Sequence, residues 1–421
     1  MHFVRPIRVL DQATVTQMCR RHLALRVAAP GGQRANFSHA DISGLDLSAC
    51  DLTDADFSGA RCLDANFDGA TLESAAFFGA DLRRATLRGA NLRRADLRGS
   101  SLRGADLTGA DMADADLREG VITSQGEDGN LHAMSHQAMP SEATSALMIG
   151  ANLSRAKMGA IIAMQADFSD ALMRGCRLVR AHLKNARLEG ANLEGADLSG
   201  ANLEGANLRN AVMTGASTWM MNTRGADMTG AITGKQPDIA AAKLELPVHE
   251  LLERHAHWVK TLGREGKSAV LNGADVRSLQ TLANRDLAGI AANGAIFQGM
   301  DLSGVILAGA QLKDADFRFA KLAGADLRGA NLQGARFNSA DMTGAQLGPL
   351  VLANNRRLPT NLGGAHLRYV KLNKGDLRDI VANQADFTGS DVSQARLEGA
   401  RLDYADMSDV RGYTPPKTAA A

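Results

Sequence analysis

Apolar and polar residues follow each other along this chain with a period of five residues. Taking the apolar residue of each group as the centre i, a small residue, usually Ala, occupies i−2, and Asp or Asn usually occupies i−1. These groups of five, here called quintets, run in phase from Phe37 to Ile122, from Met148 to Thr233 and from Leu282 to Met407. The pattern leaves little of the chain for any other kind of domain.

A period of five matches neither the 3.6-residue repeat of a helix nor the two-residue alternation of a flat strand. The chain must therefore turn regularly. We expect each quintet to form one short extended side and a corner, with i−2 and i facing inward and glycine at i+2 easing the turn.

The spacing of phenylalanine supports a coil of four quintets. A coil of twenty residues would stack centres with that spacing as a ladder of rings inside one wall, with neighbouring coils about 4.8 Å apart. Two trios of centres have this spacing: Phe37, Phe57, Phe77 and Phe297, Phe317, Phe337. Opposite charges such as Arg174 and Glu194 recur at the same interval, as cross-strand neighbours would.

Two segments outside the quintets have helical periodicity, at residues 11–27 and 247–262. Aligning His22 with His255 matches their apolar stripes and sets Trp258 against Leu25. Since the first coil of a solenoid exposes its core and unpaired backbone groups, we expect each helix to cover one. The histidines would then bond to first-coil backbone, because buried polar groups are seldom unpaired.

The chain therefore reads as a duplication of a helical cap plus a coil stack. The predicted domains are an N-terminal helical cap over 1–32, a first coil stack over 33–234 with a loop excursion at about 123–145, a connector and second cap over 235–266, a second coil stack over 267–410, and a flexible tail over 411–421.

The quintets, of general form A(D/N)LxG, resemble the pentapeptide repeat family over most of the chain. The resemblance implies an all-β solenoid: a right-handed quadrilateral β-helix with four pentapeptides per coil. In this chain it would form two solenoids, each preceded by a short α-helical cap. The best understood members resemble duplex DNA and protect gyrase, a type II topoisomerase, from quinolones. They also end in a C-terminal dimerisation helix, for which residues 409–421 show no pattern.

Composition narrows the classes of function. The net charge is +1, and the first quintet tract carries 15 acids and 10 bases, a net charge of −5, so neither reproduces the dense charge of DNA. No apolar run reaches the length of a membrane span, and the start lacks a signal peptide's apolar stretch, so we expect a cytoplasmic protein. The four cysteines read as inward-facing small hydrophobes.

Candidate chemistry is sparse. The sequence has no phosphate-binding, dinucleotide-binding, nucleophile-elbow or zinc-protease motif, and regular walls offer few concave sites. We expect no enzyme, no cofactor and no metal site.

The outward positions are where a partner would bind. A basic girdle occupies successive i+1 positions: Arg83, Arg88, Arg93, Arg98 and Arg103. Trp219 and four candidate contact residues are predicted to face outward, the four being Phe78, Phe319, Tyr369 and Tyr404. They indicate either a solvated surface or a docking surface for another protein.

We therefore expect a non-enzymatic scaffold or adaptor that binds another protein, with no direct nucleic-acid binding and no membrane contact. A homodimer through the C-terminal coil, near Leu402 and Met407, is a further hypothesis. The alternative function is that of a DNA-mimicking modulator of a type II topoisomerase such as gyrase.

Overall fold

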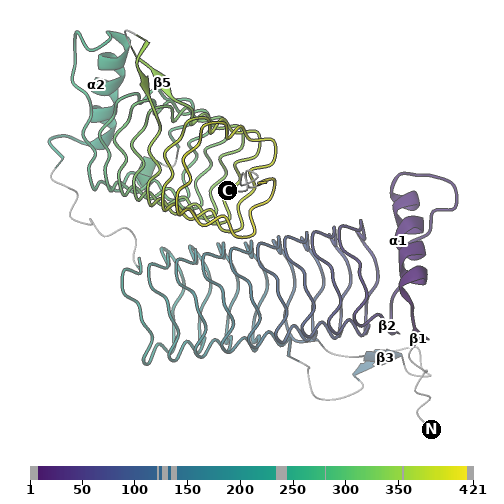
Figure 1. The fold of residues 1–421 in the computed structure, drawn as a ribbon. Helices are drawn as coiled ribbons and strands as arrows, with labels where there is room; N and C mark the ends of the chain where they lie inside the picture. The colour runs from purple at the N-terminus through teal and green to yellow at the C-terminus, as the bar shows by residue number, and fades with distance from the viewer. Residues whose placement is uncertain are drawn as a thin grey trace. The chain divides into compact units, whose positions relative to one another are not determined.

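Figure 1 shows the computed structural model of the chain, which describes residues 8–120, 123–125, 131–133, 140–233, 244–279, 281–352 and 355–414. The chain divides into two compact units, Met1–Gln236 and Pro237–Ala421, each with an apolar core of its own. Most of the predicted connector and tail, at 234–243 and 415–421, lies outside the described residues.

Parallel backbone hydrogen bonds join each coil to the next. The N–H of Phe37 donates to the carbonyl of Asp56 at 2.7 Å, and the N–H of Asp56 donates back to the carbonyl of Ala35 at 3.2 Å. The resulting bridge between Asn36 and Asp56 recurs at the i−1 positions of the uninterrupted wall at a spacing of twenty residues. The first coil of unit 2 holds one extra residue, so Val270 bridges to Ala291 at a spacing of twenty-one. Four quintets therefore complete one coil.

The polar residue at i−1 shapes each corner. Asp41 Oδ1 accepts the N–H of Ser43 at 3.0 Å, and Asn66 Oδ1 accepts the N–H of Asp68 at 2.9 Å. This local bond mimics a backbone turn and satisfies an outward N–H. The following residue adopts the left-handed conformation, as at Gly59 with φ of 62°. The preferences for Asp or Asn at i−1 and Gly at i+2 follow from this corner.

Inward side chains form one apolar column in each unit. Phe37 and Phe57 stack with ring centroids 4.8 Å apart, and Phe57 and Phe77 with centroids 4.6 Å apart. Phe67 meets Phe57 edge to face at 5.6 Å. The second trio, which begins at Phe297, stacks at 4.8 and 5.0 Å. The ring spacing equals the separation of adjacent coils.

Longer helices and strands lie only at coil ends and interruptions of the described wall. In chain order they are β1 (Arg8–Val9), α1 (Gln12–Arg26), β2 (Ala40–Asp41), β3 (Thr123–Gln125), β4 (Leu131–Ala133), α2 (Val248–Lys260), the 3-10 helix η1 (Arg277–Leu279), β5 (Leu350–Val351) and β6 (Arg357–Leu358). β1 pairs in parallel with β2 on the first coil, whereas β3–β4 and β5–β6 are antiparallel hairpins.

Each long helix has a distinct start. α1 begins after Asp11, whose carboxylate accepts the N–H of Thr14 at 2.8 Å and so caps the helix. The Thr14 side chain and, after it, this backbone N–H lower the pKa of Asp11. α2 begins after Pro247, whose φ of −52° suits the entry to a helix. The buried faces consist of Val15, Cys19 and His22 on α1, and Leu252 and His255 on α2.

The first interruption lies in unit 1. Ser101 bridges to Glu142, forty-one residues further on, so the wall resumes at residues 141–143. The excursion predicted over 123–145 therefore ends earlier than expected, before residue 141. Ala143, whose exposed fraction is 0%, fills a centre position in which the sequence pattern showed no aliphatic residue. Ile122, the last predicted centre before the excursion, and residues 126–130 and 134–139 lie outside the described residues.

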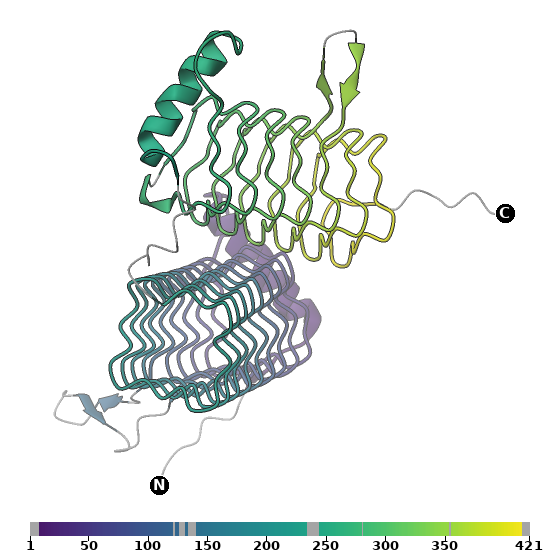
Figure 2. The ribbon, with the colours of Figure 1, turned by 90° about the vertical axis from the view of Figure 1, so that its left-hand side faces the viewer.

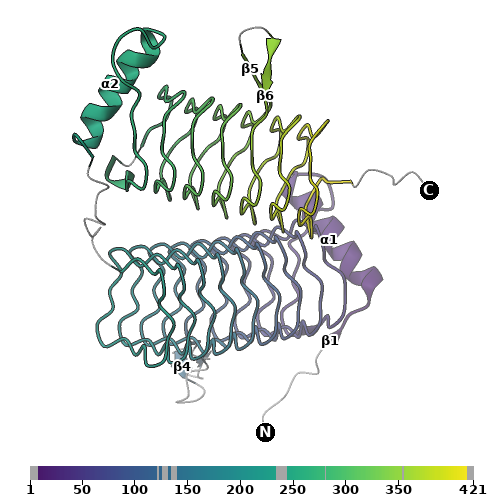
Figure 3. The ribbon, with the colours of Figure 1, turned by 60° about the vertical axis from the view of Figure 1, so that its left-hand side comes forward.

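The second interruption lies in unit 2 and was missed by the quintet pattern. Asn331 bridges to Asn361, thirty residues on, and the ten extra residues include strands β5 and β6, which project from the wall (Figures 2 and 3). Leu352 and Arg357, which the pattern placed at inward centres, are exposed. Ten residues equal two quintets, so the insertion leaves the phase of the pattern unchanged.

A buried hydroxyl closes the wall at both interruptions. Thr360 Oγ1 accepts the N–H of Gly329 at 2.9 Å and donates toward the carbonyls of Leu327 and Gly348, at 3.1 and 3.3 Å. In unit 1, Ser141 Oγ accepts a glycine N–H at 2.9 Å and contacts carbonyls at 3.1 and 2.8 Å. Both hydroxyls occupy an i−2 position that usually holds Ala.

We predict that Phe57→Ala destabilises unit 1 by about 3–5 kcal/mol, because it removes the middle ring of a buried ladder. Urea unfolding of the full chain measures the loss. Trp219→Ala in the same unit is the matched control; this ring is 73% exposed, so its removal should cost less than about 0.5 kcal/mol. Equal losses in the two variants would show that the ladder is not a stabilising core.

Candidate functional site

The basic girdle is a set of ion pairs. Each of its five arginines lies within 3.3 Å of a carboxylate on the same or an adjacent coil: Arg83 on Asp81, Arg88 on Asp106, Arg93 on Asp111, Arg98 on Asp96, and Arg103 on Glu142. The Arg83 guanidinium accounts for most of the lowering of the Asp81 pKa. Exposed pairs of this kind contribute little to stability. The girdle therefore presents neutralised guanidinium groups, not a free basic patch.

The four predicted outward aromatics differ in exposure. Tyr404 is 91% exposed. Phe78 and Tyr369 are half-buried, each beside an arginine whose guanidinium carbon lies 5.5 Å and 5.7 Å from the ring, respectively. Phe319 is only 9% exposed, so the prediction that it is a surface aromatic is wrong. An outward position fixes the direction of a side chain, whereas its exposure depends on what packs beside it.

The β5–β6 hairpin carries a cluster of exposed apolar side chains. Val351, Leu352 and Leu358 are 58%, 38% and 39% exposed. At its base, Leu350 lies so close to the wall that a Cβ on Gly329 would be 2.6 Å from the Leu350 Cβ. The close approach explains the glycine at 329 and holds the base of the hairpin against the wall.

Two charged side chains accompany this cluster. Arg357 pairs with Asp379 on the wall at 3.3 Å. Arg356 is exposed and has no ion pair among the residues that the structure describes. The hairpin thus presents an apolar surface with a cation at its edge.

His22 joins α1 to the first coil of unit 1. Its Nδ1 accepts the N–H of Ala35 at 3.0 Å, and its Nε2 lies 2.9 Å from the carbonyl of Thr53. Because Nδ1 must accept, the proton lies on Nε2, which donates to Thr53. Both nitrogens of this 1% exposed ring therefore form hydrogen bonds to the first coil.

His255 makes the corresponding contact in unit 2. Its Nδ1 accepts the N–H of Ala269 at 3.1 Å, the wall alanine that corresponds to Ala35. Its Nε2 is buried without a hydrogen-bond partner in the described part of the chain. Trp258 stacks on the imidazole with ring centroids 5.5 Å apart. Burial lowers the pKa of His255 below its usual 6.5.

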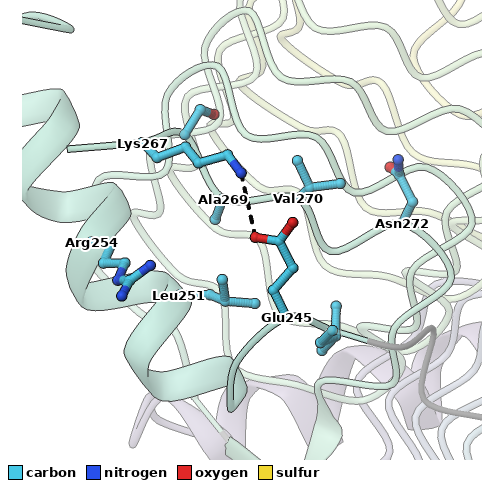
Figure 4. A pocket seen from close by; sticks show the side chains of 9 residues that line it. Glu245, Leu251, Arg254, Lys267, Ala269, Val270 and Asn272 are labelled. Atoms are coloured by element: carbon cyan, nitrogen blue, oxygen red, sulfur yellow. Dashed lines mark hydrogen bonds and ion pairs between the residues drawn. The ribbon is translucent and has the colours of Figure 1, made fainter.

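A hollow of about 320 Å³ lies between α2 and the first coil of unit 2 (Figure 4). Leu251 and Val270 face it, and at its rim Glu245 pairs with Lys267 at 3.3 Å. Arg254, also at the rim, pairs with Glu250 at 3.5 Å. The charged side chains around the hollow are therefore paired with one another.

The described residues contain no cluster of three or more His, Cys, Asp or Glu side chains that could hold a metal ion. None of the helices in the described ranges is long and apolar enough to cross a membrane.

The wall geometry agrees with the sequence profile of pentapeptide repeats, which matches more than half of the chain. The eight matched stretches are residues 35–73, 80–118, 164–200, 176–215, 191–230, 286–318, 310–347 and 383–411. The chain belongs to the pentapeptide repeat family, whose members fold as right-handed β-helices.

Solved structures of similar chains are also pentapeptide repeat proteins. HetL, involved in heterocyst differentiation regulation in the cyanobacterium Nostoc sp. strain PCC 7120, is 23% identical over 76% of this chain and 89% of its own, with a TM-score of 0.25. Rfr23 from the cyanobacterium Cyanothece 51142 is 28% identical over 32% of this chain and 90% of its own, with a TM-score of 0.28.

QnrB1, a plasmid-mediated fluoroquinolone resistance protein, is 21% identical over 51% of this chain and 94% of its own, with a TM-score of 0.27. The sequence matches no curated protein.

The buried His255 predicts a pH dependence for unit 2. Its pKa is lower in the folded than in the unfolded chain, so the unfolded chain binds the proton first as the pH falls below about 6.5. Titration of this histidine therefore leaves the stability of unit 2 unchanged above that pH and lowers it increasingly below that pH. Urea unfolding at pH 7.5 and 5.5 should show a lower midpoint for unit 2 at the acidic pH.

His255→Asn keeps an acceptor for the Ala269 N–H without a titrating group, so it should flatten this pH dependence. Its midpoint at pH 7.5 should be lower, because the buried imidazole that stacks on Trp258 is lost. His249→Asn on the exposed face of α2 is the control and should keep the wild-type dependence. If the urea midpoint of unit 2 in His255→Asn still falls between pH 7.5 and 5.5 as it does in the wild type, His255 is not the group that causes the pH dependence.

Proposed function

We propose that the chain is a non-enzymatic scaffold that binds another protein, and that the β5–β6 hairpin is a principal docking element. The observation that carries the proposal is the apolar exposure of Val351, Leu352 and Leu358 on an arm that projects from an otherwise regular wall. Exposed apolar clusters on a rigid support are typical of protein-binding sites.

The hairpin is not needed to complete the coil. Without its ten residues, Asn331 and Asn361 would stand at the ordinary spacing of twenty, and the wall would continue. The insertion therefore adds exposed apolar surface with no gain for the wall itself. A function in binding accounts for its presence.

The chemistry of the hairpin indicates its partner. Val351 and Leu352 would enter an apolar pocket or groove, and Arg356 would meet an acidic group at the rim of that groove. Tyr404, the fully exposed aromatic of the same unit, is a second candidate contact. The girdle arginines contribute less in this proposal, since binding through them requires the loss of existing ion pairs.

We further propose the layout that supports this function: two solenoids, each covered at its first coil by a helix. The contacts of His22 with Ala35 and of His255 with Ala269 support it. In unit 1, Gln12 adds hydrogen bonds of 2.8 Å to both the N–H and the carbonyl of Asp46. These contacts satisfy backbone groups that a bare first coil would expose.

The last coil of unit 2 supports the hypothesis of a homodimer. Its apolar side chains are only partly buried: Leu397, Leu402, Met407 and Val410. A second copy placed against this coil would cover them. Light scattering tests the dimer, and a monomeric mass for the full chain would reject it.

The charge of the wall argues against a DNA-mimicking modulator of gyrase. Four acidic residues of the first tract, Asp81, Asp96, Asp106 and Asp111, are paired with girdle arginines, so this part of the wall does not offer a continuous anionic face. A gyrase supercoiling assay with the full chain distinguishes the two functions, and inhibition at micromolar protein would favour the alternative.

Val351→Ser combined with Leu352→Ser should weaken partner binding by about tenfold or more, because two anchoring side chains are lost. A photo-crosslinking amino acid at 351 should capture a discrete protein in the cell, and the same group at Leu262, which is 85% exposed, is the control site. Unfolding curves of the double variant should match the wild type. Equal crosslinking from both sites would contradict docking at the hairpin.

A further inference from the structure

Two of the four cysteines meet where α1 lies on the first coil of unit 1. Cys19, on the buried face of α1, is 7% exposed, and Cys50, on the first coil, is half-buried against the same apolar core. One helical turn further on, His22 contacts the carbonyl of Thr53, three residues after Cys50. The helix and this side of the coil are therefore held together by contacts independent of the cysteines.

Printed contacts aside from the thiols join α1 to the coil beside them: His22 lies 2.9 Å from the carbonyl of Thr53, and Arg26 pairs with Asp51, the residue after Cys50, at 3.7 Å. The interaction between the two thiols lowers the pKa of Cys50 and raises the pKa of Cys19. Thiolate character favours attack on a disulfide, whereas a buried thiol nearby can complete the exchange. Cys50 is also the more exposed of the two.

We propose that Cys19 and Cys50 are a thiol modification site that reacts with low-molecular-weight disulfides and closes into a disulfide between α1 and the first coil. The Cys50 thiolate attacks one sulfur of the small disulfide, forms a mixed disulfide and releases one small thiolate. The Cys19 thiol then loses its proton to solvent and attacks the Cys50 sulfur, which releases the second small thiolate. Two protein thiols are oxidised, and one small disulfide is reduced to two thiols.

The other cysteines lack this arrangement. Cys62 and Cys176 are fully buried among wall side chains, and burial raises the pKa of Cys176 to about 12. Unit 2 provides an internal comparison, because Leu252 occupies the place of Cys19 and Arg285 occupies the position of Cys50. There Arg285 pairs with Glu253 of α2 at 3.5 Å. Unit 2 joins its helix to the coil by charge where unit 1 has the thiol pair.

The disulfide would tie the helix to the coil that it covers. In the reduced protein, that attachment depends on hydrogen bonds, one ion pair between Arg26 and Asp51, and apolar packing. Closing the chain between residues 19 and 50 restricts the unfolded state, so it stabilises unit 1 and not unit 2. In the oxidised protein, α1 should detach from the first coil of unit 1 less readily.

The test treats the reduced full chain with oxidised glutathione, blocks free thiols with N-ethylmaleimide, and maps peptides by mass spectrometry. We expect a linked Cys19–Cys50 peptide, no retained glutathione, and maleimide on Cys62 and Cys176 after unfolding. The thermal transition of unit 1 should rise by about 5–10 °C on oxidation and return with dithiothreitol, while that of unit 2 stays constant.

Two variants separate the roles of the thiols. Cys19→Ser should retain one glutathione on Cys50, because no second thiol resolves the mixed disulfide. Cys50→Ser should retain none, because Cys19 is buried. Stable glutathione on Cys50 of the wild-type chain without the linked peptide would overturn the proposal, as would a wild-type chain that shows no reaction. A failure of the hairpin experiment would leave this result unaffected, since the thiol pair lies in the other unit.

Discussion

Every coil of this protein depends on the hydrogen bonds that its centre residues donate to the carbonyls of the following coil. The bond from Phe37 to Asp56 and its return from Asp56 to Ala35 fix the coil at twenty residues, and the same pair of bonds recurs along both walls. This ladder brings identical positions of successive coils into register. The stacked phenylalanines and the charge pairs between adjacent coils are consequences of that register, since neither determines the spacing alone.

The quintet pattern predicts the features that repeat and misses those that interrupt. The spacing of Phe37, Phe57 and Phe77 predicts rings in contact, and their centroids lie 4.6–4.8 Å apart. The alignment of His22 with His255 predicts equivalent backbone contacts, and both imidazoles accept the N–H of a first wall alanine. These predictions succeed because period and polarity determine which side chains face inward.

The β5–β6 hairpin escaped prediction because an insertion of two quintets preserves the phase, so only Arg357 at a centre position signalled it. The resumption of the wall at Ala143 was missed for the opposite reason: a small residue fills a position where the pattern requires an aliphatic one. The sequence also identifies the girdle arginines but not the carboxylates with which they pair. Arg88 pairs with Asp106, eighteen residues away, because the side chain crosses diagonally between coils. Which carboxylate an arginine contacts depends on its side-chain rotamer and not on the five-residue period of the sequence.

The buried hydroxyls of Thr360 and Ser141 have a consequence for how this architecture can change. Each bonds to backbone groups where the chain leaves and re-enters the wall, so the coils on either side stay joined across the interruption. A solenoid of this kind can therefore accept an inserted segment without a change in the neighbouring coils. Its binding surface can therefore change while the core stays the same, and the wall acts as a constant framework that carries exchangeable binding segments.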